Sequence, residues 1–486
     1  DLAELDLLLV REHTGLDDDL EDVAVAGDYI EKVGRFRATA DLEIDARGLA
    51  VSPGFINPHS HIDQTIAKDP EAQASLLQGV TTEIVGVDGR SAADLEKHFA
   101  EVSHEEIGIN YGSLVGQGSI RQAVLGSDSR TATQSEITAM QAMVKKAMEQ
   151  GAFGLSTGLA YLPGTYTSTE EIIRLAQAAA PFKGVYVSHI RNESDRVISA
   201  VKEALDIGKG AGIPVVISHI KISSSINDPS REEVIARNTE TMIKTISAYQ
   251  KSGGQVYADL YPYRVSFFLI NRRLEEVLWR YPLDNILISA GSKQGHLGKT
   301  ITEIAEEEDA EPGVIAQRLA GDPQTKVCVN NLSEASLRQL LQADFTMIGM
   351  DNVVYWPDPS YLPPAHPRNY GTYPKILGEY VREEGVLPLE KAVHKMTGLT
   401  AQVYGIQKRG FIREGYFADL VVFDPQTIRD RATYWEPNRP PQGVMYVIVN
   451  GKPAVSKGGN NPGARVLTGI RNGKIIRHGK SFSQHP

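Results

Sequence analysis

Two histidines separated by one residue, His59 and His61, are the first residues in the chain whose types and spacing could do chemistry. In an extended strand, side chains at positions i and i+2 point to the same face, so both imidazoles would converge while Ser60 turns away. Two nitrogen donors on one face can bind a single divalent metal ion. A His-x-His pair often occurs without such a role, so the hypothesis needs support from elsewhere in the chain.

Four further side chains that could bind a metal ion close segments that read as strands. They are Asp88, His189, His219 and Asp351. Any one of them could be only the polar end of a buried strand. That explanation accounts poorly for three strand ends with histidine in a chain that has only 12 histidines. Together these residues offer nitrogen and carboxylate ligands for one or two zinc-like ions.

A site of this kind is suited to hydrolysis. A bound divalent ion lowers the pKa of a water molecule and polarises a carbonyl oxygen. A carboxylate beside the water can take its proton and pass it to a leaving amine. Asp351 ends the last predicted strand and is our candidate for that acid/base role. It could instead serve only as a metal ligand, or have both roles.

The segments that carry these residues alternate with helical patterns, which is typical of βα units and a parallel sheet. Eight strands in series predict a (β/α)8 TIM-like barrel, whose active sites lie at the carboxyl ends of the strands. The predicted strands are 54–61, 81–88, 111–118, 152–158, 185–189, 214–219, 255–261 and 346–351. The segment from His189 to His219 fits one crossover unit, which makes its two strands parallel and places both histidines at the same end of the sheet.

Both ends of the chain read as short β segments interrupted by Gly and Asp. We therefore expect an α/β protein in which residues 1–52 and 413–486 together form a small β-sandwich domain. Residues 53–412 would form the barrel. The long stretch between Tyr261 and Thr346 predicts an insertion at about 282–345.

Composition excludes several classes of protein. The net charge of −11, from 50 basic and 61 acidic residues, repels polyanions, so we expect no nucleic-acid partner. No run of 18 apolar residues occurs, so we expect no membrane-spanning helix. The single cysteine, Cys328, excludes an intrachain disulfide and a Cys-rich zinc site. The chain begins at Asp1; we expect export if a signal peptide preceded it and a cytoplasmic location otherwise, and the oligomeric state stays open.

Ordered blocks along nearly the whole chain resemble the N-acyl-D-amino-acid deacylases (D-aminoacylases) of the amidohydrolase superfamily. The His-x-His element is shared by many amidohydrolases, whereas the SHIR, SHIK and HPR blocks in this order are more specific. The blocks are PGFINPHSH (53–61), GVTT (79–82), GLSTGL (154–159), SHIRNE (188–193), SHIK (218–221), HPRNYG (366–371), KMTG (395–398), RG (409–410) and AD (418–419).

The resemblance implies a metal-dependent amide hydrolase, most consistent with one or two Zn²⁺ ions. His189 and His219 match the ligands of the family's tightly held metal. His59, His61 and Asp351 match the second site, and Asp351 also matches the catalytic acid/base. Three positions match the groups that hold the carboxylate of the acylated amino acid, which a guanidinium, an ammonium and a phenol suit chemically: Lys221, Tyr261 and Arg368. Tyr161 could line the same pocket or be a packed aromatic.

Two positions depart from the family pattern. Members carry a cysteine ligand after the second strand, where this chain has Asp88 in GVDG (86–89). A carboxylate can still ligate or bridge divalent ions, but it is harder and less selective for zinc than a thiolate. A serine near the substrate carboxylate is replaced by Phe267, with Ser266 adjacent, which could favour a different or larger substrate group.

The leading hypothesis is hydrolysis of the amide bond of N-acyl-D-amino acids or small dipeptide-like N-acyl amino acids, with the D preference implied by the resemblance alone. A second hypothesis is a cyclic amidase of the dihydropyrimidinase or dihydroorotase type. Those enzymes place a carboxylated lysine at the fourth strand end, and AFGLSTG (152–158) has none. A third is a non-catalytic barrel scaffold, against which the nearly complete ligand set argues.

Overall fold

The strands predicted for the barrel are present in the computed structural model. The model describes all of the chain except residues 1–6, 12–21, 37, 224–229, 271–273, 275–277, 279–280, 292, 323–324, 354–365, 435, 458–464 and 480–486. The strands are β6 (Phe55–Asn57), β7 (Val80–Val85), β8 (Asn110–Ser113) continued by β9 (Val115–Gly116), β10 (Gly154–Gly158), β11 (Val185–His189), β12 (Val215–Ile217), β13 (Val256–Leu260) and β17 (Thr346–Ile348). Because both faces of a parallel sheet are covered, strands such as β7 are buried at every residue.

Parallel pairing follows the chain order around a closed ring. One sheet runs β6-β7-β8, and the other runs β9-β10-β11-β12-β13-β17. The ring closes beyond β17 and β6 through a parallel bridge between Ser60 and Asn352. There the backbone N–H of Asp351 donates to His59 O at 2.9 Å, and that of His61 donates to Asn352 O at 2.8 Å. The predicted (β/α)8 barrel is confirmed.

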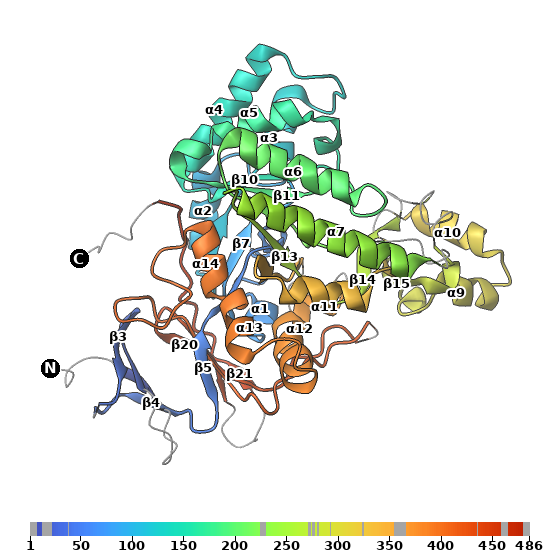
Figure 1. The fold of residues 1–486 in the computed structure, drawn as a ribbon. Coiled ribbons are helices and arrows are strands. Elements are labelled where there is room, and N and C mark those ends of the chain that lie inside the picture. The colour runs from blue at the N-terminus through green and yellow to red at the C-terminus, as the bar shows by residue number, and fades with distance from the viewer. Residues whose placement is uncertain are drawn as a thin grey trace.

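Helices surround the barrel, as the ribbon shows (Figure 1). They are α1 (Gln73–Leu76), α2 (Leu95–His104), α3 (Gln117–Leu125), α4 (Gln134–Gln150), α5 (Thr169–Gln177), α6 (Val197–Ala211), α7 (Arg231–Lys251), α11 (Glu334–Gln342), α12 (Arg368–Lys375), a π-helical segment (Ile376–Glu383), α13 (Leu389–Met396) and α14 (Gly398–Tyr404). Short 3₁₀ turns occur at Ile62–Gln64, Gly164–Tyr166, Ala180–Phe182, Leu283–Asn285 and Gln294–His296. Among the described residues, no helix combines the length and apolar composition needed to cross a bilayer.

Helix α6 illustrates how local sequence builds one βα unit. Val197, Val201 and Leu205 repeat at helical spacing and are buried, and the helix ends at Gly212, whose φ is +70°. The connected strands β11 and β12 pair in parallel, as predicted. The helix begins after Arg196, and the amide oxygen of Asn192 accepts hydrogen bonds from the backbone of the turn before it.

Two sheets built from strands at both ends of the chain form the predicted β-sandwich. One has the order β3-β2-β1-β4 and the other β21-β20-β19-β18-β5. Their bounds are β1 (Leu7–Arg11), β2 (Asp22–Ala26), β3 (Tyr29–Gly34), β4 (Leu42–Asp45), β5 (Ala50–Pro53), β18 (Leu420–Phe423), β19 (Val444–Val449), β20 (Lys452–Lys457) and β21 (Arg465–Leu467). Val25, Ile44, Leu420 and Ile448 belong to one buried cluster between N- and C-terminal strands. The domain boundaries at 52/53 and 412/413 stay predictions.

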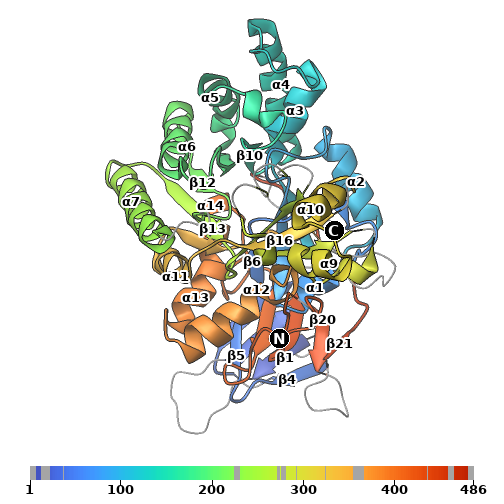
Figure 2. The same cartoon turned by 90° about the vertical axis from the view of Figure 1, so that its right-hand side faces the viewer.

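An inserted unit interrupts the barrel between β13 and β17. It consists of an antiparallel sheet in the order β14 (Val265–Leu269), β16 (Lys326–Asn330), β15 (Ile286–Ala290), with α9 (Ile301–Glu307) and α10 (Pro312–Ala320). The unit has its own apolar cluster, which includes Ile288, Ile304 and Val327. It projects to one side of the barrel in Figure 1 and lies in front of it in Figure 2. Its first strand begins at residue 265, earlier than the predicted 282.

Candidate active site

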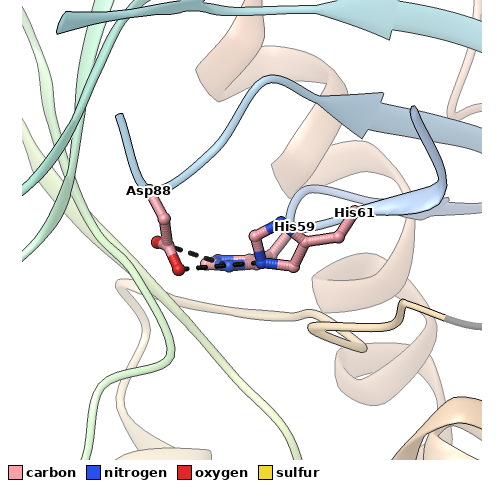
Figure 3. Close-up of side chains that lie close together, drawn as sticks. All are labelled: His59, His61 and Asp88. Carbon is pink, nitrogen blue, oxygen red and sulfur yellow. Dashed lines mark ion pairs between the residues drawn. The ribbon is translucent and has the colours of Figure 1, made fainter. Parts of the chain in front are cut away.

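The six residues predicted to bind metal converge at the carboxyl ends of the barrel strands, although five of them lie just beyond the strands and only His189 lies within one. Figure 3 shows His59 and His61 pointing toward Asp88. Both Nε2 atoms lie 3.6 Å from carboxylate oxygens of Asp88. The donor atoms of these three residues all lie within 4.8 Å of one another. This is the convergence that the His-x-His spacing predicted.

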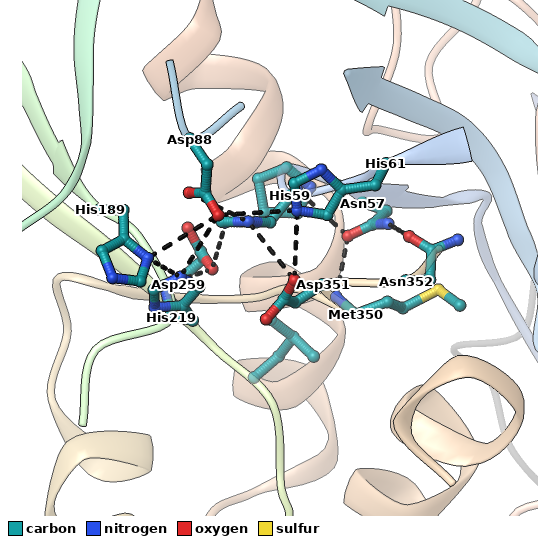
Figure 4. Close-up of polar contacts among 12 residues, drawn as sticks. Asn57, His59, His61, Asp88, His189, His219, Asp259, Met350, Asp351 and Asn352 are labelled. Atoms are coloured by element: carbon teal, nitrogen blue, oxygen red, sulfur yellow. Dashed lines mark hydrogen bonds and ion pairs between the residues drawn. The ribbon is translucent and has the colours of Figure 1, made fainter. Parts of the chain in front are cut away.

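A second group of donors shares Asp88 with the first. His189 Nδ1 and His219 Nε2 lie 2.9 Å apart, and they lie 3.7 and 3.8 Å from Asp88 Oδ2. Asp88 therefore stands between the two pairs of histidines, as Figure 4 shows. A carboxylate with two oxygens in this position can serve two neighbouring ions.

Asp351 joins the cluster from beyond the carboxyl end of β17, the strand that neighbours β6 in the ring. Its Oδ1 lies 3.4 Å from His61 Nε2 and 3.7 Å from His59 Nε2. Its Oδ2 forms a 2.7 Å ion pair with Arg368 at the start of α12. One oxygen of Asp351 therefore faces the histidines, and the other faces a residue predicted to bind substrate.

Three of these residues have a backbone conformation that L-amino acids rarely adopt. The φ angles are +53° at Asp88, +33° at His219 and +49° at Asp351. Such left-handed turns are unfavourable by about 1–3 kcal/mol at non-glycine residues, and they concentrate at functional sites. The barrel holds these three turns at the strand ends from which the side chains enter the cluster.

Buried polar residues that the sequence analysis did not select position the cluster. Asn57 Oδ1 accepts the backbone N–H groups of His59 (3.2 Å) and Met350 (2.9 Å), and so ties together the segments that carry His59 and Asp351 (Figure 4). Its amide nitrogen donates to the carboxylate of Glu83, a buried residue whose pKa burial raises to about 7. An amide that contacts two strand ends fixes their separation.

Asp259 is a second positioning residue. It lies in β13 and is 1% exposed; its Oδ1 accepts the backbone N–H of His219 at 2.8 Å and lies 3.4 Å from His59 Nδ1. A carboxylate behind an imidazole orients the ring and makes it a better ligand. The sequence carried a signal for this residue, because Asp259 is the only charged residue in the strand segment VYADL.

The donor set fits a divalent metal ion. Among the described residues, buried atoms without a hydrogen-bond partner include Nε2 of His59 and Oδ1 of Asp88, which lie 3.6 Å apart. Buried polar atoms are nearly always paired, so orphaned atoms that converge point to a ligand. Imidazole and carboxylate together suit zinc, manganese or cobalt.

Electrostatics keeps both carboxylates of the cluster ionised. Burial opposes the charged form of Asp351, but the Arg368 charge and the His61 hydrogen bond outweigh it and hold the pKa well below its usual range. The pKa of Asp88 is likewise held well below its usual range, because the histidines around it outweigh the effect of burial. The same acids raise the pKa of His61 to about 9 against the effect of burial. Ionised carboxylates are the form that binds metal.

A cavity of about 610 Å³ opens beside the cluster, and all the residues predicted to bind substrate line it. Arg368 lies over the ring of Tyr261, 4.7 Å from its centroid, and the buried Nε of Arg368 has no hydrogen-bond partner among the described residues. Lys221 Nζ lies 2.6 Å from Glu193 Oε1 and 2.8 Å from His219 Nδ1. Glu193, which the sequence analysis did not select, therefore neutralises Lys221.

Tyr161 and Ser266 also line this cavity. The ring of Tyr161 packs against that of His189, with centroids 4.5 Å apart. Ser266 and Phe267 enter from β14 of the inserted unit. The structure therefore brings every predicted site residue except His59 to the lining of one cavity, and the fully buried His59 contacts that lining through Asp88.

Comparisons with known proteins agree with this architecture. The family model described as Amidohydrolase family matches residues 42–254 and 333–455. D-aminoacylase of Alcaligenes xylosoxydans xylosoxydans is 32% identical over 94% of this chain and 93% of its own length. N-acyl-D-glutamate deacylase of the same organism is 33% identical over 88% of each chain.

One solved structure extends the comparison to three dimensions. N-acyl-D-glutamate deacylase from Bordetella bronchiseptica, crystallised with zinc and a phosphonate mimic of the tetrahedral intermediate, superposes with a TM-score of 0.83. It is 32% identical, and the match covers 97% of this chain and 99% of that one. The chain thus belongs to the amidohydrolase family and, within it, to the group of D-aminoacylases and N-acyl-D-amino-acid deacylases.

Proposed function

We propose that the protein hydrolyses the amide bond of N-acyl-D-amino acids, releasing a carboxylate and a free D-amino acid. The observation that carries this proposal is the ion pair between Asp351 and Arg368, which joins the candidate metal ligands to the candidate carboxylate-binding residues within one cavity. An N-acyl amino acid has its scissile amide and its carboxylate a few bonds apart, so its site needs these two functions side by side.

The metal would be held by the six clustered side chains, with Asp88 shared between the two pairs of histidines. The ligands are His59, His61, Asp88, His189, His219 and Asp351. Zinc is our first choice, and one or two ions fit the donor set. When bound, a divalent ion polarises the acyl carbonyl and lowers the pKa of a water molecule. The D-glutamate deacylase relative contains zinc.

Arg368, Tyr261 and Lys221 would bind the carboxylate of the substrate. The unpartnered Nε of Arg368 is a buried donor, and a guanidinium can bind a carboxylate through two parallel hydrogen bonds. The phenol of Tyr261, beneath the guanidinium, adds a further donor. Binding the carboxylate at these three residues places the amide next to the histidine cluster. Such orientation of the reacting group raises the rate of the chemical step.

Asp351 would move the proton. Its low pKa keeps it ionised before reaction, so it can accept the proton of the attacking water and then donate it to the nitrogen of the departing amino group. Tyr161 and Ser266 would line the space around the acyl and amino-acid groups.

A substrate panel tests the proposal directly. N-acetyl-D-amino acids, N-acetyl-L-amino acids, D-dipeptides, hydantoin and dihydrouracil would be assayed with added Zn²⁺, Mn²⁺ or Co²⁺. We expect free D-amino acids from the N-acetyl-D series and little reaction with the L series. Ring opening without deacylation would instead favour the cyclic amidase, against which the sequence of β10, GLSTG, argues because it lacks a lysine.

A further inference from the structure

Among the residues that the structure describes, four lysine and arginine side chains line the cavity, and they differ in how their charge is balanced. Lys221 is paired with Glu193 at 2.6 Å, and Arg368 with Asp351 at 2.7 Å. Arg90 is exposed to water. Lys326 is half-buried, and among the described residues its ammonium has no ion pair or hydrogen bond; its contact is with the ring of Phe267.

The strand register places Lys326 and Phe267 on the same face of the inserted sheet. Phe267 of β14 pairs with Cys328 of β16, and Leu269 pairs with Lys326, so the two side chains are diagonal neighbours. Lys326 Nζ lies 5.5 Å from the centroid of the Phe267 ring, and the guanidinium carbon of Arg368 lies 5.7 Å from the same centroid. Both cations therefore lie over one aromatic ring and cannot be farther apart than the sum of these distances.

An ammonium in this position is unfavourable without an anion. Burial, followed by repulsion from Arg368, lowers the pKa of Lys326 to about 8. Groups of like charge at this spacing, partly removed from water, are stabilised when a negative ligand binds to both. A ligand with two carboxylates separated by a short apolar chain would satisfy the two cations and pack its methylene groups on Phe267.

We propose that Lys326 binds a carboxylate on the side chain of the substrate, so that the enzyme prefers N-acyl-D-amino acids with acidic side chains, such as N-acyl-D-glutamate. This inference rests on the proposed function and names its substrate class. Arg368 would hold the α-carboxylate and Lys326 the side-chain carboxylate. Sequence identity does not indicate which amino-acid side chain the enzyme prefers, because the D-aminoacylase and the D-glutamate deacylase are almost equally similar to this chain, at 32% and 33% identity.

The sharpest test compares two substrates of the same shape. N-acetyl-D-glutamate and N-acetyl-D-glutamine differ in a carboxylate and an amide, so their ratio of kcat/KM isolates the charge. For a charge-assisted hydrogen bond we expect the wild type to favour the glutamate by about tenfold or more. Lys326→Met should lower kcat/KM for the glutamate to about that for the glutamine, while the value for the glutamine changes less than about threefold.

Two further variants separate charge from folding. Lys326→Arg keeps the charge and should retain part of the preference for the glutamate. Lys293→Met removes an exposed lysine of the same inserted unit, one that does not line the cavity, and should leave the substrate ratio unchanged. Thermal unfolding and bound metal would be measured for each variant. In Lys326→Met the bound metal should not change and the unfolding temperature should not fall, because the variant removes a half-buried charge.

The outcomes distinguish this inference from the proposed function. A wild type that hydrolyses N-acetyl-D-glutamine as well as N-acetyl-D-glutamate overturns the role of Lys326 and leaves the deacylase intact, and this measurement needs no variant. An unchanged ratio in Lys326→Met overturns it as well. If no N-acyl-D-amino acid is hydrolysed with any metal, the proposed function itself is wrong.

Discussion

The two sides of the cavity are built in different ways. On the barrel side, His59, His189 and His219 are 0–3% exposed, and Asn57 and Asp259 hold their segments in place. On the side of the inserted unit, Lys326 is half-buried and contacts an aromatic ring. The barrel side is therefore preorganised, whereas on the other side the described residues give the ammonium of Lys326 no ion-pair partner.

This difference matches a division of roles between the residues of the barrel, which would carry out the reaction, and those of the inserted unit, which would select the substrate. Groups that bind a metal and move a proton must be held within fractions of an ångström, which a closed ring of strands with buried polar contacts can do. Groups that select a substrate need only complement it, and an inserted unit can vary without disturbing the barrel. The family model matches the chain on both sides of residues 255–332, the stretch that contains all the strands and helices of the inserted unit.

The largest expected effect is the loss of activity when metal is removed from the barrel side of the cavity. Dialysis against a chelator should reduce activity to below about one hundredth, and added Zn²⁺, Mn²⁺ or Co²⁺ should restore it. The unfolding temperature should fall in parallel, because an ion bound only by the native state stabilises it. Elemental analysis with Asp88→Asn tests the shared ligand, which should lower the bound metal. Full activity in a preparation free of metal would contradict the assigned ligands.

Asp351→Asn removes the proton carrier while keeping its shape. We expect kcat to fall by about 10²–10⁴-fold, the usual contribution of general acid/base catalysis. KM should change little, because Arg368 still carries its charge. Steady-state kinetics on an N-acetyl-D-amino acid would measure both, with bound metal as the control. A variant that keeps more than a tenth of kcat would exclude Asp351 from proton transfer.

Arg368→Ala acts at the boundary between the two sides. Loss of the guanidinium should raise KM for substrates with a free carboxylate by about 10–100-fold, the value of a buried charge-assisted contact. The amide of the same substrate, which lacks the carboxylate, serves as the internal control and should be affected less. An unchanged KM would remove the anchoring role of Arg368.

Asn57→Ala tests whether the barrel side depends on its buried amide. The variant leaves the backbone N–H groups of His59 and Met350 without their acceptor. The free energy of unfolding should therefore fall by about 2–3 kcal/mol. Metal affinity should fall by about tenfold, because Asn57 fixes the segments that carry two ligands. Chemical denaturation and metal titration would measure the two effects, and a stable variant with normal affinity would count against the network.

The smallest expected effect tests the inserted unit through the pH dependence of KM. The pKa of Lys326 lies at about 8 in the free protein, lower than the usual value, so its positive charge is present below pH 8 and lost above it. KM for N-acetyl-D-glutamate should therefore be constant below pH 8 and rise above it, by at most about tenfold per pH unit. KM for N-acetyl-D-glutamine should lack this rise, and equal profiles for the two substrates would contradict it.

Sequence reasoning reached the barrel, the sandwich and the clustered ligands because each leaves a local trace. Strand-length apolar runs end in His189 and His219, and helical spacing connects them, so parallel strands follow from chain connectivity. It did not identify Asn57, Glu83 or Asp259 as positioning residues. Their roles depend on contacts between segments up to 295 residues apart, such as Asn57 with Asn352, which no local pattern reveals.

By itself, the sequence determined which chemical groups the protein carries and at which end of the strands they stand, because strand polarity and crossover handedness follow from local chain geometry. Only the tertiary structure decided which charges neutralise one another. It paired Lys221 with Glu193 and Arg368 with Asp351, and it set Lys326 beside an aromatic ring. Electrostatic partners depend on distance in space, and the folded barrel and its inserted sheet set those distances.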